Sequence, residues 1–234
     1  MKNLNKGLLL FFALFVASHA WAANVLIFDS PNLIGVDDKG FLSGFYSANN
    51  GKTSCFYLFV QRHTGRNLPD SGEYSAREIL TFTPQDRSFL FGDRNKDYDI
   101  GGYLYRRGDT MIIRTSKTQA GCGNAMGAFE FGPEESGAFP YTVEKRIPAI
   151  GIRLIKNRSL FYDYKDGKFV ARKGYLTKWD GVVVLRTRDR FSYVRFADPG
   201  ANVADPGRVT TGWIHSADLV NPFPPSTNKD QSHD

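Results

Sequence analysis

The sequence predicts a mainly β protein made of two small β-barrel or β-sandwich domains. Short runs such as "SCFYLFV" and "TMIIRTS" are aromatic or β-branched and are bounded by Gly, Asn, Asp or Pro, as strands between turns are. The chain has 19 Phe and 11 Tyr, and these side chains suit half-buried pleated surfaces. Apolar residues at helical spacing are missing beyond the first two dozen residues, so few helices are expected.

Residues 1–22 have the pattern of a secretory signal peptide. Lys2 and Lys6 precede an apolar stretch at 8–17, and an Ala-Trp-Ala site ends at Ala22, where we expect cleavage. The apolar stretch is shorter than the roughly 20 residues of a membrane span, and no second run of this kind follows. We therefore expect a periplasmic or secreted protein with no membrane span after cleavage.

The mature chain is mildly basic, which fits simple solubility or, as the second interpretation, an anionic partner. Loss of Lys2 and Lys6 lowers the formal net charge from +6 to +4, and the remaining basic residues are spread along the chain. An exported protein meets no genome, so nucleic acid is not an expected partner. A mildly basic surface would steer cell-wall polymer, lipid headgroups or an acidic protein toward it. Simple solubility explains the same charge without a partner.

The first predicted domain covers residues 24–144. The segment "GFLSGFYSANNGKTSCFYLFV" is a strand, a Gly-containing turn and a strand, and therefore predicts a hairpin, while "SGEYSAREILTF" fits either a helical turn or a strand. Cys55 and Cys122 are the only cysteines, and an even count in an oxidising compartment predicts one disulfide. In architecture this domain resembles the periplasmic barrels that inhibit cell-wall enzymes.

The second predicted domain covers residues 148–221. The strand pattern restarts after "VEKRIPA" with "IGIRLIKN" and continues to "TTGWIHSADLV". A domain of this size lies near the lower limit for independent folding, so we expect it to dock onto the first. The last segment, residues 222–234, is Pro-rich and then polar, and is predicted to be a disordered tail.

The second domain resembles a bacterial SH3-like domain in the order of its elements. "IGIRLIKNRSLFYD" supplies a first strand and a polar loop, "YLTKWDGVVVL" a strand entry with Trp179 where Gly is usual, and "RFSYVRF" a middle strand. "GWIHSADL" supplies the closing Gly-Trp strand and turn, in which Gly212 allows close packing and Ser216 or Asp218 can bond backbone amides. Phe191 stands where a Trp is common.

The resemblance implies a shallow peptide-binding groove formed by loop aromatics. The candidate binding residues are Tyr162, Tyr164, Trp179, Phe191 and Tyr193. Alternation along a strand places Phe191 and Tyr193 on one face and Val194 on the other, so both rings are exposed if Val194 faces the core. The alternative is that these aromatics fill the contact with the first domain.

The chain offers little for catalysis. A thiol hydrolase needs a free Cys beside a His, and Cys55 precedes His63 by eight residues, but disulfide pairing is the favoured use of the cysteines. No G-x-S-x-G motif occurs. The loop "DRNKDYD" lacks the Gly and Glu of a calcium-binding EF loop. We therefore expect no catalytic residues, no metal and no cofactor.

The leading hypothesis is an exported, non-catalytic binding protein. It would engage a protein partner or a cell-wall peptide of peptidoglycan through the SH3-like domain. One alternative is a periplasmic inhibitor or immunity protein against a cell-wall-degrading toxin. The other is a cell-wall hydrolase that uses His63 or His215.

Overall fold

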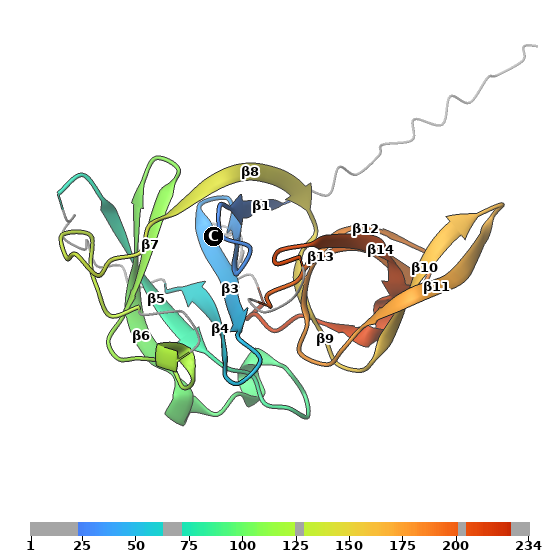
Figure 1. Cartoon of the computed structure of the whole chain (residues 1–234), viewed down its shortest axis with the longest axis horizontal. Helices are drawn as coiled ribbons and strands as arrows, with labels where there is room; N and C mark the ends of the chain where they lie inside the picture. The colour runs from blue at the N-terminus through green and yellow to red at the C-terminus, as the bar shows by residue number, and fades with distance from the viewer. Residues whose placement is uncertain (1–22, 63–71, 125–128, 201–204, 226–234) are drawn as a thin grey trace, which may run out of the picture.

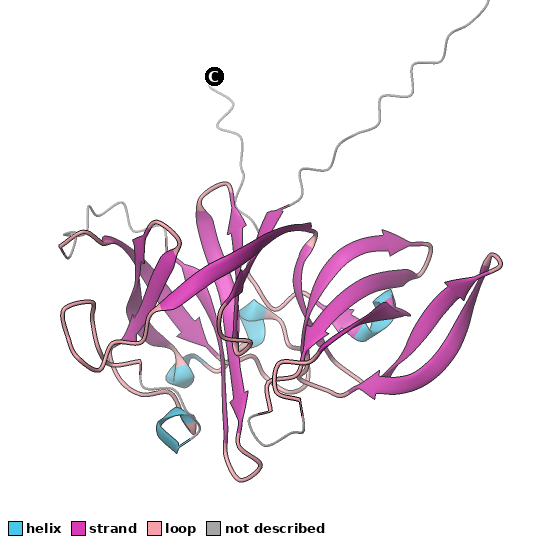
Figure 2. Ribbon diagram, turned by 45° about the horizontal axis from the view of Figure 1, so that its top comes forward, coloured by secondary structure: helices cyan, strands magenta, loops and turns pink. Residues whose placement is uncertain are grey.

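A computed structural model of the chain describes residues 23–62, 72–124, 129–200 and 205–225. Within these ranges the protein is mainly β, as predicted, and its helices are single 3-10 turns (Figure 2). No helix in this part of the chain has the length and apolarity to cross a membrane. The predicted signal peptide at 1–22, and the tail from residue 226 on, lie outside the described residues.

The first domain is a closed barrel of eight antiparallel strands that follow one another in sequence order. The ring closes because β1 pairs with both β2 and β8 (Figure 1). The strands are β1 Ala23–Phe28, β2 Leu33–Asp38, β3 Phe41–Asn49, β4 Ser54–Gln61, β5 Ser75–Phe82, β6 Ile100–Arg107, β7 Thr110–Thr115 and β8 Tyr141–Ala149. The segment that fitted either helix or strand is therefore the strand β5.

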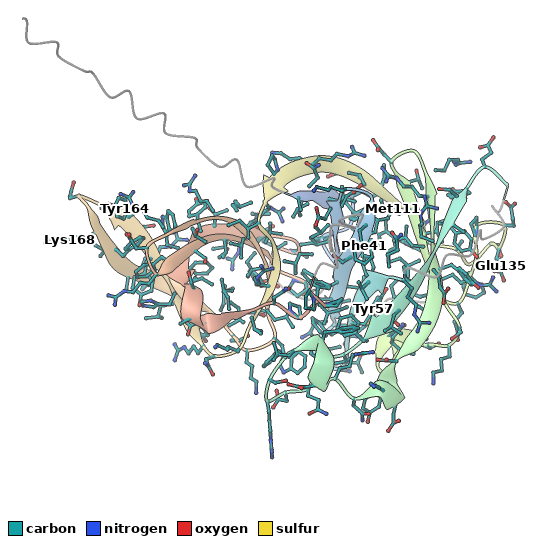
Figure 3. The ribbon with its side chains drawn as sticks, turned by 180° about the vertical axis from the view of Figure 1, so that it is seen from behind. Phe41, Tyr57, Met111, Glu135, Tyr164 and Lys168 are labelled. Atoms are coloured by element: carbon teal, nitrogen blue, oxygen red, sulfur yellow. A yellow bond between two sulfur atoms is a disulfide. The ribbon has the colours of Figure 1, made fainter. Side chains whose placement is uncertain are left out.

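Alternation along the strands divides the side chains between the barrel interior and its outer face. In β1, Leu26 and Phe28 belong to the interior cluster, whereas Val25 belongs to a separate outer cluster. Tyr57 lies inside (Figure 3), with its ring stacked on Tyr46 at 5.6 Å between centroids. Its buried hydroxyl has no hydrogen-bond partner in the described structure. Burial raises the pKa of Tyr57 well above its usual value.

The predicted disulfide is present and ties the barrel wall to a distant loop. Cys55 of β4 is bonded to Cys122, which begins the 3-10 turn η3 Cys122–Asn124, 67 residues later. Both half-cystines are fully buried in the interior cluster. The bond is compatible with an oxidising compartment.

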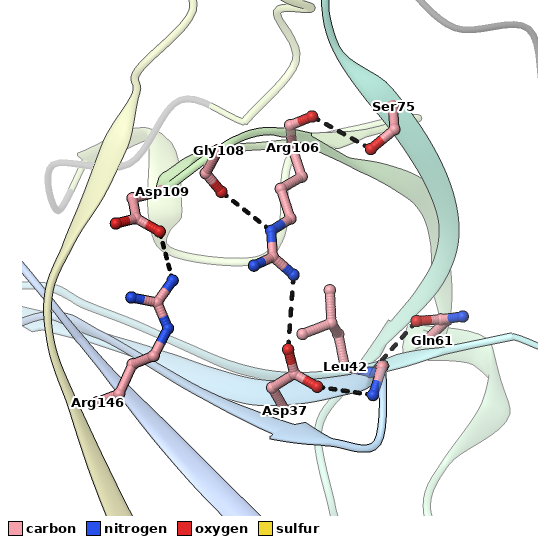
Figure 4. Close-up of polar contacts among 9 residues, drawn as sticks. Asp37, Leu42, Gln61, Ser75, Arg106, Gly108, Asp109 and Arg146 are labelled. Carbon is pink, nitrogen blue, oxygen red and sulfur yellow. Dashed lines mark hydrogen bonds and ion pairs between the residues drawn. The ribbon is translucent and has the colours of Figure 1, made fainter.

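A polar network spans one end of the barrel (Figure 4). The Arg106 side chain donates to the Gly108 carbonyl at 3.1 Å, and its guanidinium lies 3.5 Å from the Asp37 carboxylate. Beside it, Arg146 of β8 donates to Asp109, which lowers the pKa of that carboxyl. These contacts join β2, β6, β8 and the β6–β7 turn.

The second domain is a curled seven-stranded sheet (Figure 1). Its strands are β9 Gly151–Ile155, β10 Ser159–Lys165, β11 Lys168–Leu176, β12 Gly181–Arg188, β13 Phe191–Ala197, β14 Val209–His215 and β15 Leu219–Val220. Their order across the sheet is β11, β10, β14, β13, β12, β9 and β15. One face covers a compact apolar cluster, and the hairpin β10–β11 projects away from the first domain. The remaining 3-10 turns are η1 Phe91–Asp93, η2 Lys96–Tyr98 and η4 Ser216–Asp218.

The expected docking of the domains is observed, because they share an apolar cluster. Outer-face residues of the barrel, such as Phe45 and Leu58, join Leu154 and Val183 of the second sheet in that cluster. Gly181 makes the close approach possible, since a Cβ atom there would lie 2.6 Å from the Phe45 ring. The interface therefore has an apolar cluster of its own, distinct from the barrel interior and from the cluster under the second sheet.

Two boundaries differ from those predicted. The break expected between residues 144 and 148 falls inside β8, whose pairing with β1 continues to Ala149, and the second sheet begins at Gly151. The predicted disordered tail begins too early. Pro222 is buried, and Phe223 packs against the shared cluster with its ring 6.4 Å from that of Phe82. The difference arises because the apolar Phe223 ring is removed from water when it packs against the shared cluster, which holds the chain against the protein beyond residue 221.

Candidate functional site

An open groove lies on the second sheet where β10 separates from β14. Its volume is about 590 Å³. It is lined by Tyr162, Asp163, Tyr164, Lys165, Arg186, Thr187, Arg188, Tyr193 and Trp213. The register explains the opening, because β10 pairs with β14 at only one position, Tyr162 opposite Trp213, while β13 pairs with β14 along its whole length.

A row of cross-strand neighbours forms the groove wall. Tyr162, Trp213 and Tyr193 lie opposite one another on β10, β14 and β13, and Arg186 of β12 lies opposite Tyr193. Directly opposed side chains on one face of a sheet lie close enough to pack. The rings of Tyr193 and Trp213 are 5.2 Å apart, and the Tyr193 hydroxyl donates to the Thr211 hydroxyl at 3.1 Å.

A second layer of aromatic rings supports this wall. Phe169 of β11 stacks on Phe191 at 3.8 Å between centroids and also contacts Tyr164 and Trp213. Tyr162 meets Phe191 edge to face at 5.1 Å. Such contacts fix ring positions before any ligand arrives.

Two arginines of β12 lie over tyrosine rings of the groove. The Arg186 guanidinium is 4.4 Å from the centre of the Tyr193 ring, and the Arg188 guanidinium is 3.9 Å from that of Tyr164. This is cation–π geometry, which holds the cation beside the ring without removing its hydrogen-bond donors. Among the described residues neither arginine forms an ion pair.

The one carboxylate among the lining residues is compensated by other cations. Asp163 lies 3.7 Å from the Lys165 ammonium and 3.6 Å from the Arg172 guanidinium. The positive charge of Arg186 and Arg188 is therefore not balanced by Asp163 within the groove. An anionic group that enters it would be attracted, and a cationic group repelled.

The structure gathers four of the five predicted binding aromatics in one region. Tyr162, Tyr164 and Tyr193 line the groove. Phe191 shares their face but is only 4% exposed, so the expectation of an exposed ring is wrong for this residue. Val194 does face the core, as that expectation required, but rings from β10, β11 and β14 cover Phe191.

Trp179 lies elsewhere, in the contact between the domains. Its ring is 4.6 Å from Phe89 and 5.6 Å from Phe56, and its indole N–H donates to Asp86 at 3.0 Å. The alternative prediction, that the aromatics fill the contact between the domains, is therefore correct for Trp179. The hydrogen bonds from Lys178 and from this indole lower the pKa of Asp86.

Sequence reasoning missed Trp213, Arg186 and Arg188 as groove residues. The arginines occupy alternate positions in "VLRTRDR", so they point to the same face of β12, and this spacing could have identified them. Trp213 belongs to the closing Gly-Trp strand of the sequence pattern, and although it is only 7% exposed it contributes to the lining of the groove.

The turn after the Gly-Trp strand differs in its bonding from the expectation. Gly212 does permit close packing, since a Cβ atom there would lie 2.8 Å from the Phe161 ring. Ser216, however, bonds the Ser192 hydroxyl, and Asp218 accepts from the Ser159 hydroxyl at 2.6 Å. These side chains therefore join the turn to neighbouring strands instead of capping backbone amides.

The groups considered for catalysis are used otherwise or are not described. His215 packs against Phe191 at 4.3 Å and Tyr162 at 5.1 Å, and His63 lies outside the described residues. Both cysteines are in the disulfide. Within the described ranges no group of three potential metal ligands occurs. The loop that contains Asp99 forms η1 and η2 and is held by an Arg94–Asp99 ion pair at 2.9 Å.

Comparison of the chain with protein-family models, with curated proteins and with solved structures finds no match.

Proposed function

We propose that this protein is an exported, non-catalytic binding protein whose second, SH3-like domain binds a carboxylate-bearing peptide, with the peptide of cell-wall peptidoglycan as the first candidate. The observation that carries the proposal is the groove in which Arg186 and Arg188 lie over tyrosine rings. The guanidinium groups would pair with ligand carboxylates, and the rings would contact its apolar side chains.

The chemistry of the groove supports this ligand class over others. Guanidinium groups bind carboxylates through two parallel hydrogen bonds, and such charge-assisted bonds are stronger than neutral ones. Tyr164 and Tyr193 hold the two arginines in position before binding, which reduces the entropy lost when a ligand is bound. A volume of about 590 Å³ suits a short peptide segment.

Sedimentation with purified, insoluble peptidoglycan tests the proposal. The mature protein should sediment with the wall material, and Arg188→Ala should weaken binding by roughly tenfold to hundredfold, because a charge-assisted hydrogen bond contributes roughly 1.5–3 kcal/mol. Arg190→Ala is the matched control, since Arg190 is an exposed arginine of the same hairpin outside the groove lining. Binding should also weaken when the salt concentration rises.

Competition with soluble peptides identifies the part of the polymer that is bound. A wall peptide with free carboxylates should displace the protein, and the same peptide with amidated carboxylates should not. Equal binding of the wild-type protein, Arg186→Ala and Arg188→Ala would refute the role of the groove. Absence of binding to both wall material and acidic peptides would refute the ligand class.

The inhibitor alternative is favoured by a different observation, the projecting hairpin β10–β11 (Figure 1). Figure 3 places Tyr164 and Lys168 near its tip. Its strand β11 is a sheet edge with exposed Val170 and Tyr175, and an edge of this kind can insert into a cleft of an enzyme. Inhibition of a purified wall-degrading enzyme that is lost in Val170→Asp, but kept in the exposed control Val209→Asp, would support this function.

A further inference from the structure

A second hollow lies on the outer face of the first barrel, over β5, β6 and β7. Its volume is about 410 Å³, within the roughly 300–1,000 Å³ of small-molecule sites. It is lined by Glu78, Gly101, Gly102, Tyr103, Arg114, Thr115, Ser116 and Glu130. It shares no residue with the groove of the second domain.

The register places an aromatic ring between two opposite charges. Glu78 of β5 pairs with Tyr103 of β6, and Tyr103 pairs with Arg114 of β7, so the three side chains form one row on the outer face. Opposed residues on one face have Cβ atoms about 4.5–5.5 Å apart. The Tyr103 ring is 38% exposed in the middle of this row.

The hollow exists because Gly101, in the row of outward positions next to that of Tyr103, has no side chain. Gly101 points outward two positions before Tyr103, and a Cβ atom added there would meet no atom within 4 Å. The side of Tyr103 that faces Gly101 is therefore open. On the other side Tyr105 supports the row, with its ring 6.1 Å from that of Tyr103.

Both charges of the row are paired with an opposite charge, and Glu130 adds a carboxylate for which the described residues show no ion pair. Glu78 lies 3.2 Å from the Arg62 guanidinium, and the Arg114 guanidinium lies 3.9 Å from the Glu135 carboxylate. Each charged group in the row thus has an opposite charge nearby and still offers further hydrogen-bonding positions. A ligand with a strong net charge gains little here, whereas one with many hydroxyl groups finds both donors and acceptors.

We propose that this hollow is a sugar-binding site that takes a neutral pyranose unit of a glycan. One face of a pyranose ring carries C–H groups, which pack on the exposed Tyr103 ring. Its hydroxyl groups both donate and accept, and they match the carboxylates of Glu78 and Glu130 and the guanidinium of Arg114. The missing side chain at Gly101 leaves room for the sugar beside the tyrosine.

Titration of the mature protein with two neutral trisaccharides, triacetylchitotriose and maltotriose, tests this site by NMR. Saturable shifts are expected for amides of β6 and β7 with at least one of them. Tyr103→Ala should weaken binding by about tenfold or more, because ring contacts and the area they bury supply most of the contact. Gly101→Val fills the hollow while its Cβ meets no neighbour, so the barrel should fold and binding should be lost.

Three controls make the result decisive. Tyr98→Ala removes another exposed tyrosine outside this lining and should bind like the wild type. Arg188→Ala should also bind sugar normally, which separates this site from the peptide groove. Saturable binding that survives Gly101→Val, or no saturable binding of either trisaccharide, would overturn the proposal.

Discussion

Replacement of Trp179 tests the physical basis of the contact between the domains. The residue has a left-handed backbone, with φ of 79°. In the SH3-like pattern that this stretch resembles, glycine is usual at this position. Its indole ring packs between Phe56 and Phe89 of the first barrel and donates to Asp86. The side chain therefore stabilises the contact, whereas the backbone conformation that presents it is strained.

The structure gives a magnitude for each of these effects. Two ring contacts contribute about 0.5–1.5 kcal/mol each, and with the buried area of a partly exposed indole Trp179→Ala should lower the free energy of unfolding by about 2–3 kcal/mol. Left-handed backbone costs roughly 1–2 kcal/mol for a residue with a Cβ atom, and glycine offsets part of this through its unfolded-state entropy. Trp179→Gly should consequently be about 0.5–1 kcal/mol more stable than Trp179→Ala.

Urea unfolding of the three proteins, followed by far-ultraviolet circular dichroism, measures both differences. The shared cluster should keep the unfolding transition cooperative in the wild type. A change below about 0.5 kcal/mol in Trp179→Ala would show that the indole does not stabilise the contact. A glycine variant less stable than the alanine variant would refute the argument from backbone strain.

Three further changes have outcomes that follow from the structure. Replacing Cys55 and Cys122 together by Ala should cost about 4 kcal/mol in thermal or urea unfolding, because the bond closes a loop of 67 residues. Tyr57→Phe removes a buried hydroxyl without a described partner and should leave the protein as stable or about 1 kcal/mol more stable in the same measurement. The pKa of Asp86 is lowered from 3.8, chiefly by its bond to Lys178, so its contribution is present above that value and is lost as the pH falls through the lower folded-state pKa. Unfolding measured between pH 6 and pH 3 should therefore depend less on pH in Asp86→Asn than in the wild type, with the difference appearing below about pH 4.

Local patterns were sufficient for the mainly β content and the disulfide. Aromatic and β-branched runs became strands almost throughout, and two cysteines left a single possible pairing. The position of the boundary between the domains was harder to predict, because the strand β8 stays paired with β1 to Ala149 and the second sheet begins only two residues later, at Gly151. No composition shift marks a boundary inside a continuous strand.

The candidate sites depended on register, which local patterns do not determine. That Tyr162 and Tyr193 would lie on one face was open to prediction from alternation, but their common neighbour Trp213 follows only from the pairing of β10 and β13 with β14. The burial of Phe191 likewise depends on Phe169, which is 22 positions earlier in the chain and reaches it through the hairpin β10–β11. Alternation alone predicts an exposed aromatic ring at Phe191, whereas the assembled sheet covers it.

Both hollows arise where a regular sheet is interrupted. A complete sheet face presents a side chain in every row and leaves no space for a ligand beyond its surface. In the second domain β10 leaves β14 after the single pair Tyr162–Trp213, and rings and guanidinium groups line the gap. In the barrel the strands stay paired, but Gly101 removes one side chain from the row beside Tyr103. The first interruption exposes uncompensated cations, and the second exposes an aromatic ring between carboxylates and a guanidinium, so the same β architecture offers an acidic peptide and a neutral sugar two different surfaces.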